Sequence, residues 1–226
     1  MVKEKLDNVQ ERIKNAATRA GRDASDIVLV CAVKEADLEG INEAVEAGVR
    51  DIGENIVQDA VTRYELLNKK TELRWHFIGH LQTNKVKKAI RLFDLIHAVD
   101  SIRLAEELQR QAEKINKMQG ILLEVNVSGE DTKYGIAPEK LDSIAKAVRD
   151  MKNLILSGLM TMAPYSANPE DSRPHFRRLR ELRDSFSSYN CENIDMRHLS
   201  MGMSGDFEVA IEEGADIVRI GSAIFK

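Results

Sequence analysis

Near its C-terminus the chain reads RHLSMGMSGDFEVAIEEG at residues 197–214 and, after two more residues, IVRIGSAIF at 217–225. An apolar run at 198–204 leads into a turn of serine and glycine, and an acidic amphipathic segment begins near Asp206. The second apolar run then follows this segment. The order of strand, turn, helix and strand is that of a βαβ unit, so the stretch predicts two parallel strands joined by a right-handed crossover.

The same alternation extends along the rest of the chain. Eight short apolar runs, bounded by polar residues or glycine, predict strands at 27–33, 51–55, 75–80, 95–100, 121–127, 155–162, 198–204 and 217–225. Segments of helical period lie between them, for example at 37–48, 101–115, 138–151 and 171–186. Ahead of the first strand, Leu6, Val9, Ile13 and Ala17 recur at helical spacing and predict a helix over roughly residues 3 to 20.

Repeated strand and helix units of this kind predict an α/β fold, a single (β/α)8 TIM barrel with an additional N-terminal helix. Periodicity alone also allows an open, doubly wound sheet. With 226 residues the chain has the length of one barrel, so residues 1–226 are expected to form one domain. The longest connection, 163–173, is expected to be a loop on the working face.

Composition argues against nucleic-acid and membrane partners. The chain has 33 Lys and Arg residues and 37 Asp and Glu residues, a formal charge of -4, which gives no field that would attract a polyanion. Cys31 and Cys191 lie outside any CxxC pair, so neither a disulfide framework nor a zinc site is expected. No stretch has the apolar length of a signal peptide or a membrane span. These features predict a cytoplasmic protein.

The expected ends of the last two strands carry small hydroxyl-bearing residues. In a (β/α)8 barrel the working face is built at the carboxyl ends of the strands, and phosphate commonly binds near the loops after strands seven and eight. Ser200, Ser204, Gly221 and Ser222 lie there and would form a cup of hydroxyl and amide groups for a phosphate. The alternative is that they cap a helix, with Ser204 as N-cap, and close a turn. Asp206 argues against an anion at that spot.

A lysine and an arginine lie next to this proposed cup. Lys34 ends the first apolar run, where desolvation would lower the pKa of its amine and allow it to form a Schiff base. The alternative is a strand-end lysine that extends to water. Arg219 lies on the same side of the last strand as Gly221. It would either pair with an interior carboxylate, such as Glu124 or Asp100, or donate to a ring nitrogen of a bound cofactor.

Three histidines raise the question of a metal site. His76 and His80 share one side of a strand, and His97 lies in the next predicted strand. The close His-x-His pair and distant aspartate of a metallohydrolase barrel are missing from the sequence. The histidines are therefore interpreted as bonded residues of the core or the rim, and no metal is expected.

Several motifs together resemble one known family, the pyridoxal phosphate homeostasis proteins, which are related in fold to the N-terminal barrel of alanine racemase. The motifs are a lysine after the first strand, GVRDIGEN (48–55), WHFIGHLQTNK (75–85), EVNVSGEDTKYGI (124–136), GLMTMAP (158–164) and HLSMGMSGDFEVAIEEGADIVRIGSAIF (198–225). They occur in the family's order and at its spacing. The resemblance runs from the first strand to Phe225 and independently favours the barrel.

The resemblance implies a pyridoxal 5'-phosphate cofactor held as a covalent aldimine on Lys34. It assigns the phosphate to Ser204, Gly221 and Ser222, with Ser200 in the same turn, and the pyridine nitrogen to Arg219. Other residues in family motifs that line the cofactor pocket are Asn55, His80, Asn126 and Met162. The chain departs from the family pattern at Val33, Ile56 and Lys226, and Lys133 is a second lysine that could compete for the aldehyde.

These features favour a carrier over an enzyme. An arginine against the pyridine nitrogen disfavours its protonation and weakens the ring as an electron sink. The sequence also stops after the eighth strand, where a racemase needs a second acid-base group. A cytoplasmic monomer without catalytic turnover is expected, which takes part in vitamin B6 homeostasis and supplies apoenzymes transiently. The alternatives are a pyridoxal phosphate-dependent racemase or lyase, and a lysine-dependent aldolase acting on a phosphorylated sugar.

Overall fold

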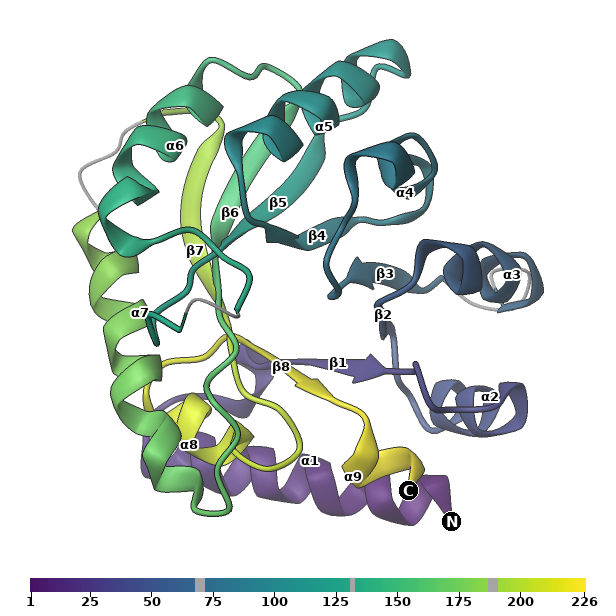
Figure 1. The fold of residues 1–226 in the computed structure, drawn as a ribbon. Coiled ribbons are helices and arrows are strands. Elements are labelled where there is room, and N and C mark those ends of the chain that lie inside the picture. The colour runs from purple at the N-terminus through teal and green to yellow at the C-terminus, as the bar shows by residue number, and fades with distance from the viewer. Residues whose placement is uncertain (68–71, 131–132, 187–190) are drawn as a thin grey trace.

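The computed structural model describes residues 1–67, 72–130, 133–186 and 191–226. Within them, eight parallel strands close into a barrel in the order β1 to β8 (Figure 1). The strands are β1 Val28–Ala32, β2 Asp51–Glu54, β3 Arg74–Phe77, β4 Leu95–Val99, β5 Gln119–Glu124, β6 Leu154–Met160, β7 Ile194–Ser200 and β8 Ile217–Ile220. The predicted barrel is confirmed, and the pairing of β8 with β1 excludes the open sheet.

Helices follow the strands and surround the barrel (Figure 1). The α-helices are α1 Val2–Arg19, α2 Leu38–Glu46, α3 Val57–Leu67, α4 Val86–Leu92, α5 Ile102–Lys114, α6 Leu141–Arg149, α7 Arg173–Ser185, α8 Phe207–Glu212 and α9 Ser222–Phe225. Short 3-10 turns are η1 Ala24–Asp26, η2 Thr83–Lys85, η3 Pro138–Lys140 and η4 Pro169–Ser172. The last of these lies in the loop predicted at 163–173.

Helix α1 precedes the barrel, as the sequence predicts. Its buried side is formed by Leu6, Val9, Ile13, Ala16 and Ala17. The helix packs along α8 and α9, so the two chain ends lie close together (Figure 1). After the helix, Arg22 donates to the carbonyl of Ala215 at 2.6 Å and pairs with Asp216 at 2.9 Å. These contacts attach the N-terminal segment to the residues that enter β8.

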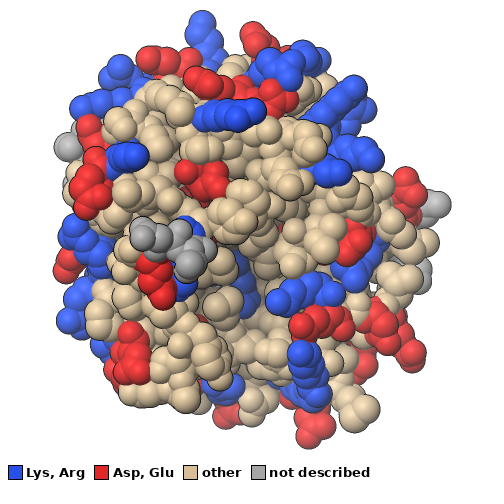
Figure 2. Space-filling model, in the orientation of Figure 1, with Lys and Arg blue, Asp and Glu red and all other residues tan. Residues whose placement is uncertain are grey.

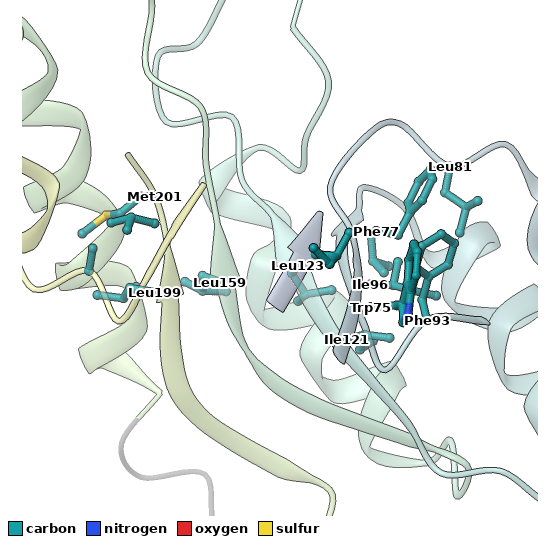
Figure 3. Packing of buried hydrophobic residues seen from close by; sticks show 14 of the residues in the cluster. Trp75, Phe77, Leu81, Phe93, Ile96, Ile121, Leu123, Leu159, Leu199 and Met201 are labelled. Atoms are coloured by element: carbon teal, nitrogen blue, oxygen red, sulfur yellow. The ribbon is translucent and has the colours of Figure 1, made fainter. Parts of the chain in front are cut away.

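The barrel has two apolar layers. Between the strands and the helices, Trp75, Phe77 and Phe93 are among the fully buried side chains, and the rings of Phe77 and Phe93 lie 5.1 Å apart (Figure 3). A separate cluster contains Val30, Ala98, Leu122, Met160 and Ile217. Alternate residues of a strand face opposite sides, so this second cluster lies inside the barrel. It is made of few side chains, and buried polar residues occupy the same interior.

The last two strands end earlier than the sequence predicts. β7 occupies 194–200 and not 198–204, because the chain leaves the extended conformation after Ser200 and Gly202 has a φ of +92°. β8 ends at Ile220, and the residues expected to extend it form the short helix α9. Both turns bring the following residues back over the carboxyl end of the barrel.

The turn between β7 and α8 is shaped by an aspartate. Asp206 is the N-cap of α8, so the prediction of Ser204 at this position is wrong. The Asp206 carboxylate accepts the N–H of Met203 at 2.7 Å and the hydroxyl of Ser172 at 3.0 Å. Ser204 Oγ instead accepts the N–H of Ala223 at 3.2 Å. The serine therefore joins this turn to α9, and the aspartate both closes the turn and joins it to η4.

Charged side chains of both signs are interspersed on the face seen in Figure 2, and uncharged residues occupy most of its centre. Mixed signs of this kind produce no broad field on that face. Within the described ranges, no helix combines the length and the apolar character that crossing a membrane requires.

Candidate functional site at the carboxyl ends of the strands

Strand β1 brings a lysine to the rim of the barrel. The N–H of Val33 bonds to the carbonyl of Gly53 at 3.0 Å, and Lys34 occupies the turn that follows. Its side chain is exposed, which differs from the desolvated amine that the sequence predicts, because the residue stands beyond the packed strand. Beside it, Glu35 pairs with Lys226 Nζ at 2.7 Å. The C-terminal residue therefore lies at the same rim as Lys34.

The loop after β8 passes directly over the end of β1. A Cβ built on Gly221 would lie 2.7 Å from the carbonyl oxygen of Ala32, two residues before Lys34. Glycine is therefore required for this close approach. Ser222 is exposed at the next position, and Ser204 is bonded to the same short helix. The structure thus brings Ser204, Gly221 and Ser222 of the predicted cup to the strand that carries the lysine. Ser200 does not join them, because it is buried in the barrel interior and bonded to Arg219 and His97.

Arg219 is buried inside the barrel and is held by two neighbours. Its guanidinium donates to Ser200 Oγ at 2.6 Å and to the carbonyl of Thr161 at 2.9 Å. Burial lowers its pKa to about 10, which leaves it protonated at neutral pH. Among the ion pairs of the described residues none includes Arg219, so the alternative of a structural bridge to Glu124 or Asp100 is wrong. Thr161 was not singled out from the sequence, because a backbone acceptor leaves no sequence signal.

Glu124 ends β5 with its carboxyl group in the interior. The residue is 4% exposed, and its Oε2 has no hydrogen-bond partner among the described residues. Burial, helped by the charge of Asp100 and opposed by that of Arg219, raises the pKa of Glu124 to about 7. The carboxyl group is therefore partly protonated at neutral pH.

We expect Glu124→Gln to change how stability depends on pH. Because the folded-state pKa lies above the ordinary value of 4.5, the carboxyl stabilises the fold at low pH and loses this contribution as pH rises through about 7. Between about pH 5 and pH 8.5, the free energy of unfolding of the wild type should fall by roughly 2 to 3 kcal/mol relative to that of the glutamine variant. Urea unfolding at both pH values measures this, with the exposed Glu39→Gln as control. Parallel pH curves for wild type and Glu124→Gln would contradict the prediction.

The loops after β3 and β5 meet at the rim. His80 Nδ1 lies 3.1 Å from Asp100 Oδ2, and its ring stacks on Tyr134 with centroids 3.9 Å apart. Asn126 uses its side chain within its own loop: Oδ1 accepts the N–H of Gly129 at 3.0 Å, and Nδ2 donates to the carbonyl of Glu130 at 2.9 Å. Asn126 therefore shapes the loop that brings Tyr134 to the histidine.

Asn55 follows β2 and presents a buried acceptor. Its Oδ1 has no hydrogen-bond partner within the described residues. Such an unpaired acceptor is available to a hydrogen-bond donor of a ligand. The backbone of Gly79 packs against it, since a Cβ at position 79 would lie 2.5 Å from the Asn55 carbonyl oxygen. Met162, which follows Thr161 after β6, is exposed at the same end of the barrel.

Of the three histidines that raised the question of a metal site, the two besides His80 lie in the barrel interior. His76 and His97 are buried, and their nearest nitrogens are 3.0 Å apart. Across the described part of the chain, no group of three or more His, Cys, Asp and Glu side chains could hold a metal ion. Two open surface hollows, one between η2 and α5 and one between α7 and β7, include none of the predicted site residues.

The fold and the sequence together define the class of protein. The model of the family described as "Alanine racemase, N-terminal domain" matches residues 5–226. Within this class, two curated relatives are named pyridoxal phosphate homeostasis protein. The relative from Aquifex aeolicus is 50% identical over 222 residues, covering 98% of this chain and 96% of its own. The relative from Escherichia coli is 37% identical over 223 residues, covering 97% and 94%.

The chain belongs to the pyridoxal phosphate homeostasis protein family, which confirms the resemblance. Solved structures agree. PipY of Synechococcus elongatus, with pyridoxal phosphate bound, has a TM-score of 0.84 at 30% identity over 100% of both chains. A protein of unknown function from Bifidobacterium adolescentis has a TM-score of 0.93 at 38% identity, over 99% of this chain and 94% of that one. Alanine racemase of Clostridium difficile, with 13% identity, a TM-score of 0.75 and coverage of 99% and 56%, shares the fold.

Proposed function

We propose that this protein binds pyridoxal 5'-phosphate and takes part in intracellular vitamin B6 homeostasis by supplying the cofactor to apoenzymes. The observation that carries the proposal is the position of Lys34, which follows β1 where Gly221 lets the loop after β8 pass over that strand. An amine and a cup of small residues thus share one end of the barrel. The names of the relatives and the cofactor in the PipY structure support this reading.

The residues fit the chemistry of this cofactor. Lys34 Nζ would hold the cofactor covalently as an aldimine on its aldehyde group, a reversible bond that hydrolysis or exchange with another amine would undo. Ser204, Gly221 and Ser222 would bind the phosphate through hydroxyl and amide groups.

The remaining site residues would orient the ring. Arg219 would face the pyridine nitrogen, with Ser200 holding the guanidinium at 2.6 Å. Asn55 offers the unpartnered buried Oδ1, and His80 lies on the same rim. The other predicted contacts are Asn126, which would act by shaping its loop, and Met162.

A carrier without turnover is the function that this arrangement favours. With a pKa of about 10, Arg219 stays protonated at neutral pH and has N–H donors but no acceptor for a ring proton. An unprotonated pyridine withdraws electrons poorly, so the site suits reversible holding better than carbanion chemistry. We also propose a single domain over residues 1–226, a monomer and a cytoplasmic location. Glu124, whose pKa is about 7, keeps a racemase or lyase as the second candidate, because it is an acid-base group of suitable strength.

The test begins with the wild-type protein. Added pyridoxal 5'-phosphate should produce the absorbance band of an imine, and borohydride reduction followed by peptide mapping should place the label on Lys34. The loaded protein should then activate a pyridoxal phosphate-dependent apoenzyme. Exchange of the α-proton of added amino acids with solvent would favour the enzyme alternative. A label spread over surface lysines would overturn the proposed site.

A further inference from the structure

A chain of buried hydrogen bonds runs through the barrel interior, starting at Arg219. Arg219 Nη1 lies 2.6 Å from Ser200 Oγ, and Ser200 Oγ lies 2.8 Å from His97 Nδ1. His97 Nε2 lies 3.0 Å from His76 Nδ1. His76 Nε2 lies 2.9 Å from Asp51 Oδ1. All five side chains are buried. They come from five different strands, so the barrel fold alone brings them together.

The far end of this chain is fixed by a carboxylate. Asp51 opens β2 and receives two further hydrogen bonds from Arg74, which opens β3, at 2.7 and 2.6 Å. Burial of Asp51 opposes ionisation, but the hydrogen bonds from Arg74 and His76 hold its pKa below the ordinary value. Asp51 is therefore an acceptor only. It lies at the amino ends of the strands, whereas Ser200 closes β7 at the carboxyl end.

The two ends together determine the direction of every bond. A guanidinium can only donate, so Ser200 Oγ accepts from Arg219, and the Ser200 hydroxyl hydrogen is free to donate to His97 Nδ1. His97 then carries its proton on Nε2 and donates to His76 Nδ1. His76 likewise carries its proton on Nε2 and donates to Asp51. Every hydrogen in the chain then has an acceptor.

The reverse arrangement leaves a group unsatisfied. If His76 were a cation, its Nδ1–H would donate to His97, and His97 Nδ1–H would donate to Ser200. Ser200 Oγ would then accept twice, and the structure gives its hydroxyl hydrogen no other partner among the described residues. Such a buried unpaired donor destabilises the reverse arrangement. His97 is also faced by His76, Arg219 and His198, and burial together with these groups lowers its pKa well below 6.5.

We propose that His97 is a positioning residue for Arg219: through Ser200 it fixes the orientation of the guanidinium, and His76 and Asp51 fix its own tautomer. The inference rests on the proposed function, because the group that Arg219 would address is the pyridine ring of the cofactor. A ring nitrogen receives a directed hydrogen bond well only if the donor is already oriented. The chain supplies that orientation from inside the barrel, without touching the ligand.

The first test needs no cofactor. In ligand-free wild type labelled with 15N-histidine, long-range proton–nitrogen spectra distinguish the two tautomers. We expect both His76 and His97 to carry a hydrogen on Nε2, and His97 to have none on Nδ1. A proton on Nδ1 of His97 would overturn the one-way chain. The outcome of this measurement does not depend on cofactor binding.

The second test uses three variants and pyridoxal 5'-phosphate as the probe. His97→Phe keeps a ring but breaks the chain, and it should release the bound cofactor about tenfold faster and shift its absorbance band. His97→Gln has both a carbonyl acceptor and an amide donor and should stay within about threefold of wild type. The matched control is His198→Phe, since His198 lies two residues before Ser200 in β7 and its Nδ1 has no partner in the described structure.

The outcomes separate the two proposals. Failure of the wild type to bind pyridoxal 5'-phosphate would overturn the proposed function, while the tautomers would still report on the chain. If the wild type binds, and His97→Phe releases the cofactor no faster than His198→Phe, the positioning role is wrong and the proposed function survives. Urea unfolding of each variant identifies a release that is due to loss of the fold.

Discussion

Replacing Lys34 by alanine is expected to abolish covalent capture of pyridoxal 5'-phosphate. The variant has no amine at the end of β1, so no C=N bond can form there and borohydride can fix no label on the peptide that contains residue 34. The absorbance band of the bound imine should disappear. Lys34 is exposed in a turn, so the free energy of unfolding should stay within about 0.5 kcal/mol of wild type.

Two further variants show whether the amine itself is responsible. Lys34→Arg keeps the positive charge, but its permanently protonated guanidinium is a poor nucleophile, so it should behave like the alanine variant. Lys133→Ala removes the second candidate lysine, which pairs with Glu130 at 2.8 Å, and should retain the band and the label on Lys34. A Lys34→Ala protein with a full band and its label on Lys133 would move the proposed site to that loop.

The barrel could be predicted because each of its units has a local signal. Short apolar runs such as 27–33 are buried on both faces and alternate with amphipathic segments, and chain order then determines a parallel sheet. The start of β7 was missed because Asp195 and Arg197 interrupt its apolar pattern. Its end was missed because the φ of +92° at Gly202 is a property of the folded turn.

The candidate site also has features that the sequence could predict and features that it could not. Lys34, Gly221 and Arg219 could be placed at one end of the barrel from strand position alone. Their partners could not, because the stagger of neighbouring strands decides which residues meet. Arg219 bonds to Ser200 and to the backbone of Thr161, not to the carboxylates that the sequence offered. The exposure of Lys34 was also missed, since a sequence does not show how far a strand-end turn projects from the core.

The stagger of β6 against β7 itself depends on one glycine. The register of β6 shifts on both sides, between Ile121 and Leu122 toward β5 and between Leu156 and Gly158 toward β7. Gly158 has a φ of +151°, and a Cβ there would lie 2.0 Å from the carbonyl oxygen of His198. No side chain fits between the two backbones, so the glycine allows the strands to approach and sets the height at which β7 delivers Ser200.

Gly158→Ala is therefore expected to destabilise the protein by about 4 kcal/mol or more, because the methyl group can be accommodated only by separating β6 from β7. Gly48→Ala is the matched control: Gly48 has a φ of +106° with no atom within 4 Å of the added Cβ, and its cost should be about 1 kcal/mol. Urea unfolding followed by circular dichroism compares the two variants. Equal losses of unfolding free energy would mean that the backbone conformation, and not the contact with His198, explains why position 158 needs glycine. A larger loss of stability for Gly158→Ala would show that the close approach between β6 and β7, and not the backbone conformation alone, requires glycine at position 158.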